Sequence, residues 1–140
     1  MSSQNNSFIE LQPIQFPLVN RFYKRIYKKG IAHKKERVFV VKENDIICAG
    51  KLKQLDGHLL LTGIACDPAY RKQGHASQLI KSIQSLHQQP LYCFPYIHLH
   101  NFYSKLGFTQ ASPDTLPEVI HQRFTAYSKN RALLLMVYHG

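Results

Sequence analysis

Acidic residues are scarce in this chain: 8 Asp and Glu stand against 18 Lys and Arg, which gives a formal net charge of +10 over 140 residues. The excess is concentrated in residues 21–37, RFYKRIYKKGIAHKKER, where Glu36 is the one acid in a run of Lys and Arg. Such a patch can attract nucleic acid, an anionic membrane or a polyphosphate, and it can equally be a solvated face. Charge alone does not choose among these partners.

Long apolar runs are also missing. No stretch approaches the roughly 20 residues that cross a bilayer, so we expect no membrane span. The N-terminal MSSQNNS does not resemble a secretion signal and predicts a loose polar end over residues 1–7. The three cysteines, Cys48, Cys66 and Cys93, form no CxxC pair, and each lies beside apolar residues. They predict buried thiols in a reducing compartment, and hence a cytoplasmic protein.

Several catalytic signatures are absent from the sequence. It contains no GxSxG, no Walker loop and no HExxH. Cys93, His98 and His100 come nearest to a metal-ligand set, but CxxxxHxH lacks a fourth ligand at a usual spacing. We therefore expect no metal site.

The chain alternates between strand and helix patterns without an internal repeat or linker, which predicts one domain over residues 1–140. Asp56-Gly57 predicts a hairpin turn. The predicted strands are 8–11, 37–42, 46–55, 58–66, 91–94, 108–111 and 132–138, and the predicted helices are 17–30, 76–86, 99–106 and 115–129. This order is typical of an α+β domain with a largely antiparallel sheet.

The segment Thr62–Ala76, TGIACDPAYRKQGHA, carries the clearest chemical signal. A central strand ends in a proline turn, and residues 71–76 (RKQGHA) lead directly into an amphipathic helix. Backbone N–H groups at a helix start, aided by the helix dipole, favour phosphate oxygens. Gly74 and the small Ala76 leave room for a diphosphate beside the main chain, and two cations precede them. An isolated RxxGxA is also compatible with an ordinary strand-to-helix turn.

Two segments together resemble the GNAT superfamily of N-acetyltransferases. GIACDPAYRKQGHASQLI resembles its motif A, whose loop reads Arg/Gln-x-x-Gly-x-Gly/Ala. HNFYSKLGF, residues 100–108, resembles its second signature, an aromatic–Tyr pair followed by x-x-Leu-Gly-Phe. The order of motifs, strands and helices matches that fold across nearly the whole chain. The resemblance implies a GNAT-like α+β enzyme with a mixed, mostly antiparallel central sheet flanked by helices. Such an enzyme moves an acetyl group from acetyl-CoA to a primary amine, by direct attack of the amine on the thioester.

The resemblance also implies roles for single residues. The loop would wrap the CoA pyrophosphate, the strand before it would offer main-chain groups to pantetheine, and Tyr103 would be the acid that protonates the departing thiolate. The implied cofactor residues are Ile64, Ala65, Cys66, Arg71, Lys72, Gln73, Gly74, His75 and Ala76. Independently, a glycine inside an apolar strand often marks a bulge or a close approach, which fits Gly63. Phe102, Leu106 and Phe108 are predicted as core.

Two parts of the implied site stay open. Relatives often carry Asn seven residues before the Tyr to bind pantetheine, whereas this chain has Tyr96 there, and Asn101 on a different part of the turn. The base that accepts the amine proton is unassigned. A water-relayed base, or none, also fits the family. The candidates by position are His58, His98, His100 and Glu43.

A second class of function also fits: an acyl-CoA- or nucleic-acid-binding module of the same fold without catalysis. The basic segment 21–37, with Phe22, Tyr23 and Tyr27 interleaved, favours it. Those aromatics fall on the apolar stripe of the predicted helix, however, so core packing explains them better. An acetyltransferase acting on an RNA-bound amine would combine both functions. We expect a small-molecule or protein amine as acceptor, a monomer or homodimer, no membrane partner, and nucleic acid only as a less favoured partner.

Overall fold

The computed structural model describes residues 7–140. Of the loose end predicted over residues 1–7, residues 1–6 lie outside the described residues, and the prediction is wrong for Ser7, which begins a strand. Hydrogen bonds join seven strands in the order β1-β2-β3-β4-β5-β7-β6. The β4–β5 pair is parallel, and the β1–β2, β2–β3, β5–β7 and β6–β7 pairs are antiparallel. The mixed, mostly antiparallel sheet predicted from the sequence is confirmed.

The predicted alternation of elements is also confirmed. The strands are β1 (Ser7–Leu11), β2 (Arg37–Lys42), β3 (Ile46–Leu55), β4 (His58–Cys66), β5 (Leu91–Cys93), β6 (Thr109–Gln110) and β7 (Met136–Tyr138). The helices are α1 (Phe16–Ile26), α2 (His75–Ser85), α3 (His100–Lys105) and α4 (Glu118–Tyr127), and short 3-10 turns connect several elements. Contacts divide the chain into two compact units. The first combines the described residues up to Lys53 with Thr62–Leu86, and the second combines Gln54–Leu61 with His87–Gly140.

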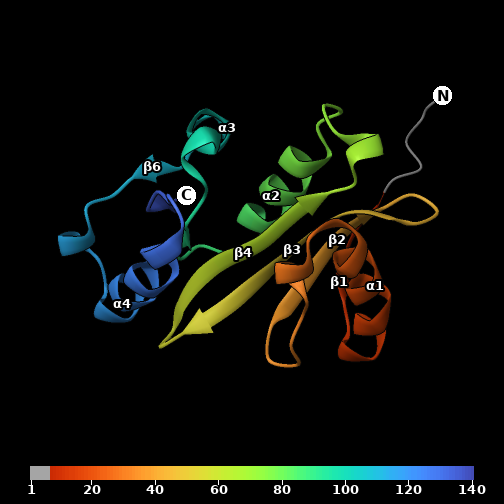
Figure 1. Cartoon of the computed structure of the whole chain (residues 1–140), viewed down its shortest axis with the longest axis horizontal. Coiled ribbons are helices and arrows are strands. Elements are labelled where there is room, and N and C mark those ends of the chain that lie inside the picture. The colour runs from red at the N-terminus through yellow and green to blue at the C-terminus, as the bar shows by residue number, and fades with distance from the viewer. Residues whose placement is uncertain (1–6) are drawn as a thin grey trace. The chain divides into compact units, whose positions relative to one another are not determined.

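In the first unit, α1 and α2 pack on opposite faces of the strands (Figure 1). Alternate residues of a strand point to opposite faces. Ala49 of β3 packs in the cluster that contains Phe22 of α1. The next residue, Gly50, faces α2, because a Cβ added there would lie 3.3 Å from Leu79. Both helices therefore bury an apolar stripe against the same strands, and the end of β4 lies in this unit.

Helix α1 ends at Ile26, four residues before the end predicted at Gly30. Tyr27 is extended (φ −159°), and Lys28–Gly30 form a separate 3-10 turn. Gly30 has a packing role instead of a capping role, because a Cβ there would lie 2.2 Å from the ring of Tyr23. The connection after α1 thus passes close over that ring. The predicted burial of the helix aromatics is confirmed for Phe22 and Tyr23.

In the second unit, α4 packs on the strands through a core of Leu60, Tyr92, Ile120, Leu135 and Val137. The β3–β4 hairpin turns at Asp56 and Gly57, whose φ values of 49° and 82° are both positive, as a two-residue type I′ turn requires. Strand β7 begins at Met136, four residues later than predicted. Leu134 donates its N–H to the carbonyl of Pro95, and Pro95 has no N–H to return. The regular ladder is interrupted there, and beyond it Tyr96 and Leu133 form an isolated bridge.

Candidate functional site

Strand β4 is distorted at Gly63, as a glycine inside an apolar strand suggested. The φ of Gly63 is +65°, a conformation that side chains rarely allow, and a Cβ there would lie 2.8 Å from Lys51 Cε. The carbonyl of Gly63 accepts a hydrogen bond of 2.8 Å from the hydroxyl of Tyr23. Side chains of α1 and β3 therefore fix the backbone of the central strand at this point.

A buried ion pair lies beside this distortion, and the sequence reasoning missed it. Lys51 Nζ is 3.3 Å from Glu36 Oε1, and the two side chains are only 6% and 4% exposed. Lys51 Nζ also donates to the carbonyl of Ile31 at 3.1 Å. Burial first, and then the charge of Glu36, raise the pKa of Tyr23 well above its usual value. Tyr23 therefore stays protonated as a hydrogen-bond donor. Two features of the sequence could have indicated this ion pair: Glu36 is the one acid among several cations, and Lys51 lies within an apolar strand.

The turn after β4 is fixed by Asp67, a second residue that the sequence reasoning passed over. Its Oδ1 accepts the N–H of Ala69 at 2.9 Å, and its Oδ2 lies 3.1 Å from Arg25 Nη1. The bond from Ala69, followed by the interaction with Arg25, lowers the pKa of Asp67 below its usual value. The N–H of Asp67 donates to the carbonyl of Ile47 at 2.8 Å. The turn is thus tied both to β3 and to the end of α1.

The loop that follows has an exposed backbone in an uncommon conformation. Lys72 and Gly74 have φ values of +65° and +83°. The first is unusual for a residue with a side chain, and strain of this kind is concentrated at functional sites. Gly74 is the N-cap residue of α2, and no side chain caps this helix start. A Cβ at Gly74 would meet no atom within 4 Å, so the space beside the helix start is open.

The side chains of the loop divide into an exposed and a packed group. Arg71, Lys72 and Gln73 are exposed, and Arg71 Nε donates to the carbonyl of Cys66 at 3.3 Å. His75 is buried, with Nε2 3.3 Å from Gln73 Oε1, and Ala76 is half-buried. The structure therefore brings the end of β4, two cations and an uncapped helix start together within the first unit.

Cys66 differs from the other two thiols, which corrects one prediction. Cys48 and Cys93 are buried as expected, but Cys66 is half-buried, because it lies where β4 opens into the turn. The interaction with the neighbouring Cys48 thiol first, and then the charge of Arg71, lower the pKa of Cys66. Burial raises the pKa of Cys93.

Tyr103 lies on α3 in the second unit and is buried. Its ring meets the ring of Phe108 edge-on, with 5.5 Å between the centroids, and the ring of Phe102 at 5.1 Å. The core prediction is confirmed for Phe108 and Leu106, whereas Phe102 is half-buried. Gly107 (φ +94°) follows α3 in a left-handed conformation, which glycine adopts readily at the end of a helix.

The candidate bases differ in their exposure and contacts, and two of them lie beside Tyr96 and Asn101, the residues at and near the position where relatives carry Asn. Glu43 is exposed on the turn between β2 and β3, and His58 is half-buried, with its ring edge-on to Tyr92. His98 is exposed and stacks on Tyr96, with 6.0 Å between the ring centroids. His100 Nδ1 lies 3.5 Å from Asn101 Oδ1.

Residues 7–140 contain neither a metal-ligand cluster nor a membrane-spanning helix. No group of three or more His, Cys, Asp or Glu side chains is placed to hold a metal ion. None of the helices there has the length and apolar character needed to cross a membrane.

A mixed, mostly antiparallel sheet flanked by helices is also the fold of solved acetyltransferases. The family model of the acetyltransferase (GNAT) domain matches residues 34–110, more than half of the chain. The chain therefore belongs to the GNAT family, a family of acyltransferases that use acyl-CoA. None of the curated proteins matches it.

Solved structures of other acetyltransferases share the fold. N-acetylglutamate synthase from Neisseria gonorrhoeae, solved with coenzyme A and N-acetyl-glutamate, gives a TM-score of 0.71 at 15% identity, over 98% of this chain and 35% of that one. The ribosomal-protein-S18-alanine N-acetyltransferase from Escherichia coli gives 0.69 at 16% identity, over 95% and 92%. Escherichia coli ElaA gives 0.71 at 14% identity, over 95% and 99%. This chain thus spans about a third of the synthase, and at these identities the likeness concerns the fold alone.

Proposed function

We propose that this chain is an acetyl-CoA-dependent N-acetyltransferase, a single domain over residues 1–140, that acetylates a primary amine by direct attack on the thioester. The observation that carries the proposal is the uncapped start of α2, with open space at Gly74 and two cations before it, directly after the distorted end of β4. Family membership supplies the reaction class.

The proposed cofactor site follows from the backbone of the first unit. The N–H groups of the first turn of α2, with Arg71 and Lys72, would hold the pyrophosphate, because a helix start presents N–H groups that lack intrahelical acceptors. In the described chain, the ladder between β4 and β5 pairs only Leu59–Leu61 with Leu91–Cys93. The main chain of Ile64–Cys66 lies beyond that ladder, and it would pair with the pantetheine arm as an added strand does.

The Gly63–Ile64 peptide is our candidate for polarising the thioester carbonyl. Tyr23 holds the carbonyl of Gly63. A trans peptide is planar, so the N–H of Ile64 points in the opposite direction and is fixed by the same contact. The amine nitrogen would form a bond to the acetyl carbon while the carbon–sulfur bond breaks. Tyr103, assigned through the second motif, would give its proton to the thiolate, and the amine proton would leave to water or to a base that stays unassigned.

The alternative of a nucleic-acid-binding module is less well supported. Phe22 and Tyr23 lie on the buried face of α1, so neither ring is available as a stacking platform for bases. The exposed cations Lys24, Lys34 and Lys35 remain compatible with a phosphate-bearing acceptor, including an RNA-bound amine. A small-molecule or protein amine, a monomeric or homodimeric state and a cytoplasmic location stay predictions.

The first test is thermal unfolding with and without ligands. Acetyl-CoA should raise the melting temperature, because a ligand at 100 times its Kd stabilises the folded state by about 2.7 kcal/mol. Pantetheine at the same concentration should have far less effect, since it lacks the pyrophosphate. Equal shifts of the melting temperature by acetyl-CoA and pantetheine would contradict the assignment of residues 71–76 as a pyrophosphate-binding loop.

A screen of amine acceptors, read by the appearance of the free CoA thiol, then tests catalysis. Turnover on at least one primary amine is expected. Binding of acetyl-CoA without turnover on any amine would favour the binding module.

A further inference from the structure

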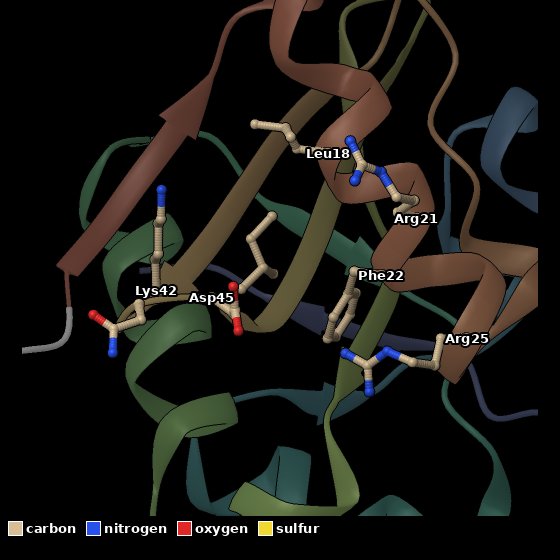
Figure 2. Close-up of a pocket in the computed structure, with 8 residues that line it drawn as sticks. Leu18, Arg21, Phe22, Arg25, Lys42 and Asp45 are labelled. Carbon is tan, nitrogen blue, oxygen red and sulfur yellow. The ribbon is translucent and has the colours of Figure 1, made fainter.

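A groove of about 430 Å³ lies beside α1 in the first unit, between that helix and the turn that joins β2 to β3 (Figure 2). Leu18 and Phe22 of α1, together with Ile46 of β3, contribute apolar lining. A volume of this size is typical of sites for small organic ligands. None of the proposed cofactor residues lines the groove, so it is a separate feature from the loop.

Three cations from two elements line the same groove. Arg21 and Arg25 come from α1, and Lys42 comes from the end of β2 (Figure 2). Arg25 is held in place by Asp67 at 3.1 Å and lies over the ring of Phe22, 5.9 Å from its centroid. Within residues 7–140, the side chains of Arg21 and Lys42 have no hydrogen-bond or ion-pair partner. The groove thus holds two cations without a partner among these residues and the guanidinium of Arg25, which Asp67 keeps in place. Such a set of charges favours binding of a phosphate group.

The groove lies next to the proposed pyrophosphate loop, and the carboxylate of Asp67 links the two. Asp67 is paired with Arg25, which lines the groove. Arg71, the first residue of the loop, bonds to the carbonyl of Cys66, directly before Asp67. The bond from Ala69 first, and then the interactions with Arg25 and Arg71, lower the pKa of Asp67. A ligand whose pyrophosphate occupied the loop would therefore have a second cationic site beside it.

We propose that this groove binds the 3′-phosphate of CoA through Arg21 and Lys42, with Arg25 at the end nearest the loop. CoA carries a phosphate monoester on the ribose that follows its pyrophosphate, so its two phosphate sites are separated by one sugar. The apolar lining of Leu18 and Ile46 suits the sugar and the adenine. The inference rests on the proposed function, because it names a second contact of the same cofactor.

Asp45 gives the proposal a test of opposite sign. Its carboxylate lines the groove and opposes an anion there. Neutralising Asp45 should strengthen binding of the 3′-phosphate, whereas neutralising Arg21 and Lys42 should weaken it. General damage to the fold would weaken binding in every variant, so a gain in one of them is diagnostic.

The experiment compares the Kd of CoA with that of dephospho-CoA, which lacks only the 3′-phosphate, by titration calorimetry. The unaltered chain should prefer CoA by about 10-fold, the effect of one or two charge-assisted contacts near a surface. The double variant Arg21→Gln/Lys42→Gln should bring the ratio close to 1 without changing the Kd of dephospho-CoA. Asp45→Asn should increase the ratio. Lys24→Gln, an exposed cation of α1 that does not line the groove, is the matched control and should leave the ratio unchanged.

Other outcomes overturn the proposal. If the double variant still prefers CoA over dephospho-CoA, the groove does not bind the 3′-phosphate. The same conclusion follows if the double variant loses affinity equally for both ligands. Adenosine 3′,5′-bisphosphate should compete with CoA in the unaltered chain. Inorganic phosphate competing equally well would indicate a nonspecific anion site. Absence of binding by either ligand overturns both the groove and the proposed function, whereas equal binding of both overturns the groove alone.

Discussion

At the scale of single residues, Tyr23 shows how a helix side chain can shape the central strand. Its ring is buried under the connection at Gly30, and its hydroxyl donates to the carbonyl of Gly63. Without that donor, the carbonyl would be left without its hydrogen-bond partner beside the buried Lys51–Glu36 pair, at a free-energy cost of about 1–3 kcal/mol. The positive φ of Gly63 and the direction of the Ile64 N–H therefore depend on one hydroxyl.

Replacing Tyr23 by Phe should lower the free energy of unfolding at neutral pH by about 1–3 kcal/mol, because the carbonyl of Gly63 loses its donor. The pKa of Tyr23 is raised in the folded state, whereas an unfolded tyrosine ionises near pH 10. The stabilisation is thus complete below about pH 10 and is lost as the pH rises further, because the unfolded state then releases a proton that the folded state retains.

Denaturant unfolding of both proteins between pH 7 and pH 10.5 measures this effect. The difference in unfolding free energy should narrow toward alkaline pH, since the other ionisable groups are common to the two proteins and cancel. A difference that stays constant with pH would show that Tyr23 does not keep its proton in the folded chain.

At the scale of elements, the loop between β4 and α2 is held by its backbone as much as by its side chains. The φ of Gly74 is +83°, which disfavours any side chain, and a Cβ there would meet no atom within 4 Å. The sequence indicated the room beside Gly74 that the proposed pyrophosphate would fill, but not the backbone conformation. Lys72 occupies the same left-handed region with a side chain present, which identifies this short segment as strained.

Gly74→Val should therefore weaken acetyl-CoA binding at least about 10-fold and also destabilise the fold by about 1–3 kcal/mol, because a branched side chain is strained in this conformation. Gly74→Asn is the matched control for strain, since Asn tolerates the left-handed region. It should lose affinity with a smaller loss of stability. Calorimetric binding and the melting temperature, measured on both variants, separate the two effects. Normal binding of acetyl-CoA by either variant would place the cofactor elsewhere.

The existence and order of the elements could be predicted because each carries its own periodic pattern, as strands 37–42, 46–55 and 58–66 show. Element ends were wrong where the local pattern does not decide them: α1 ends early at Tyr27, and β7 begins late, after the ladder is interrupted opposite Pro95. The phosphate loop could be predicted because its residues are consecutive. The contacts of Tyr23 with Gly63 and of Arg25 with Asp67 span 40 and 42 residues, and no local pattern indicates them.

At the scale of the whole molecule, the charge of +10 suits a ligand with several phosphates. A positive surface raises the local concentration of a polyanion, and its effect is screened within about 10 Å at 0.1 M salt. The same charge would also attract RNA without selectivity. Charge therefore supports acetyl-CoA capture but does not identify the acceptor, and catalysis has to be tested by the rate of the complete chain.

Replacing Tyr103 by Phe tests whether the second motif contributes chemistry to that rate. If its hydroxyl protonates the thiolate, turnover should fall by about 100- to 10,000-fold, the contribution typical of a positioned acid. The fall is smaller if a water molecule donates the proton in place of the hydroxyl. Affinity for acetyl-CoA should change little, because the aromatic ring and its contacts with Phe102 and Phe108 remain.

The alternative is that Tyr103 is a core aromatic, which its burial also suits. The Phe variant would then keep its rate and lose about 1 kcal/mol of stability from one hydrogen bond. Rate constant and melting temperature, measured on one preparation, separate these outcomes, because an acid affects the transition state, whereas a packing role affects the folded state as a whole. A full-rate, less stable Tyr103→Phe protein would exclude the acid role and leave the phosphate loop and the family assignment intact, since neither depends on that hydroxyl.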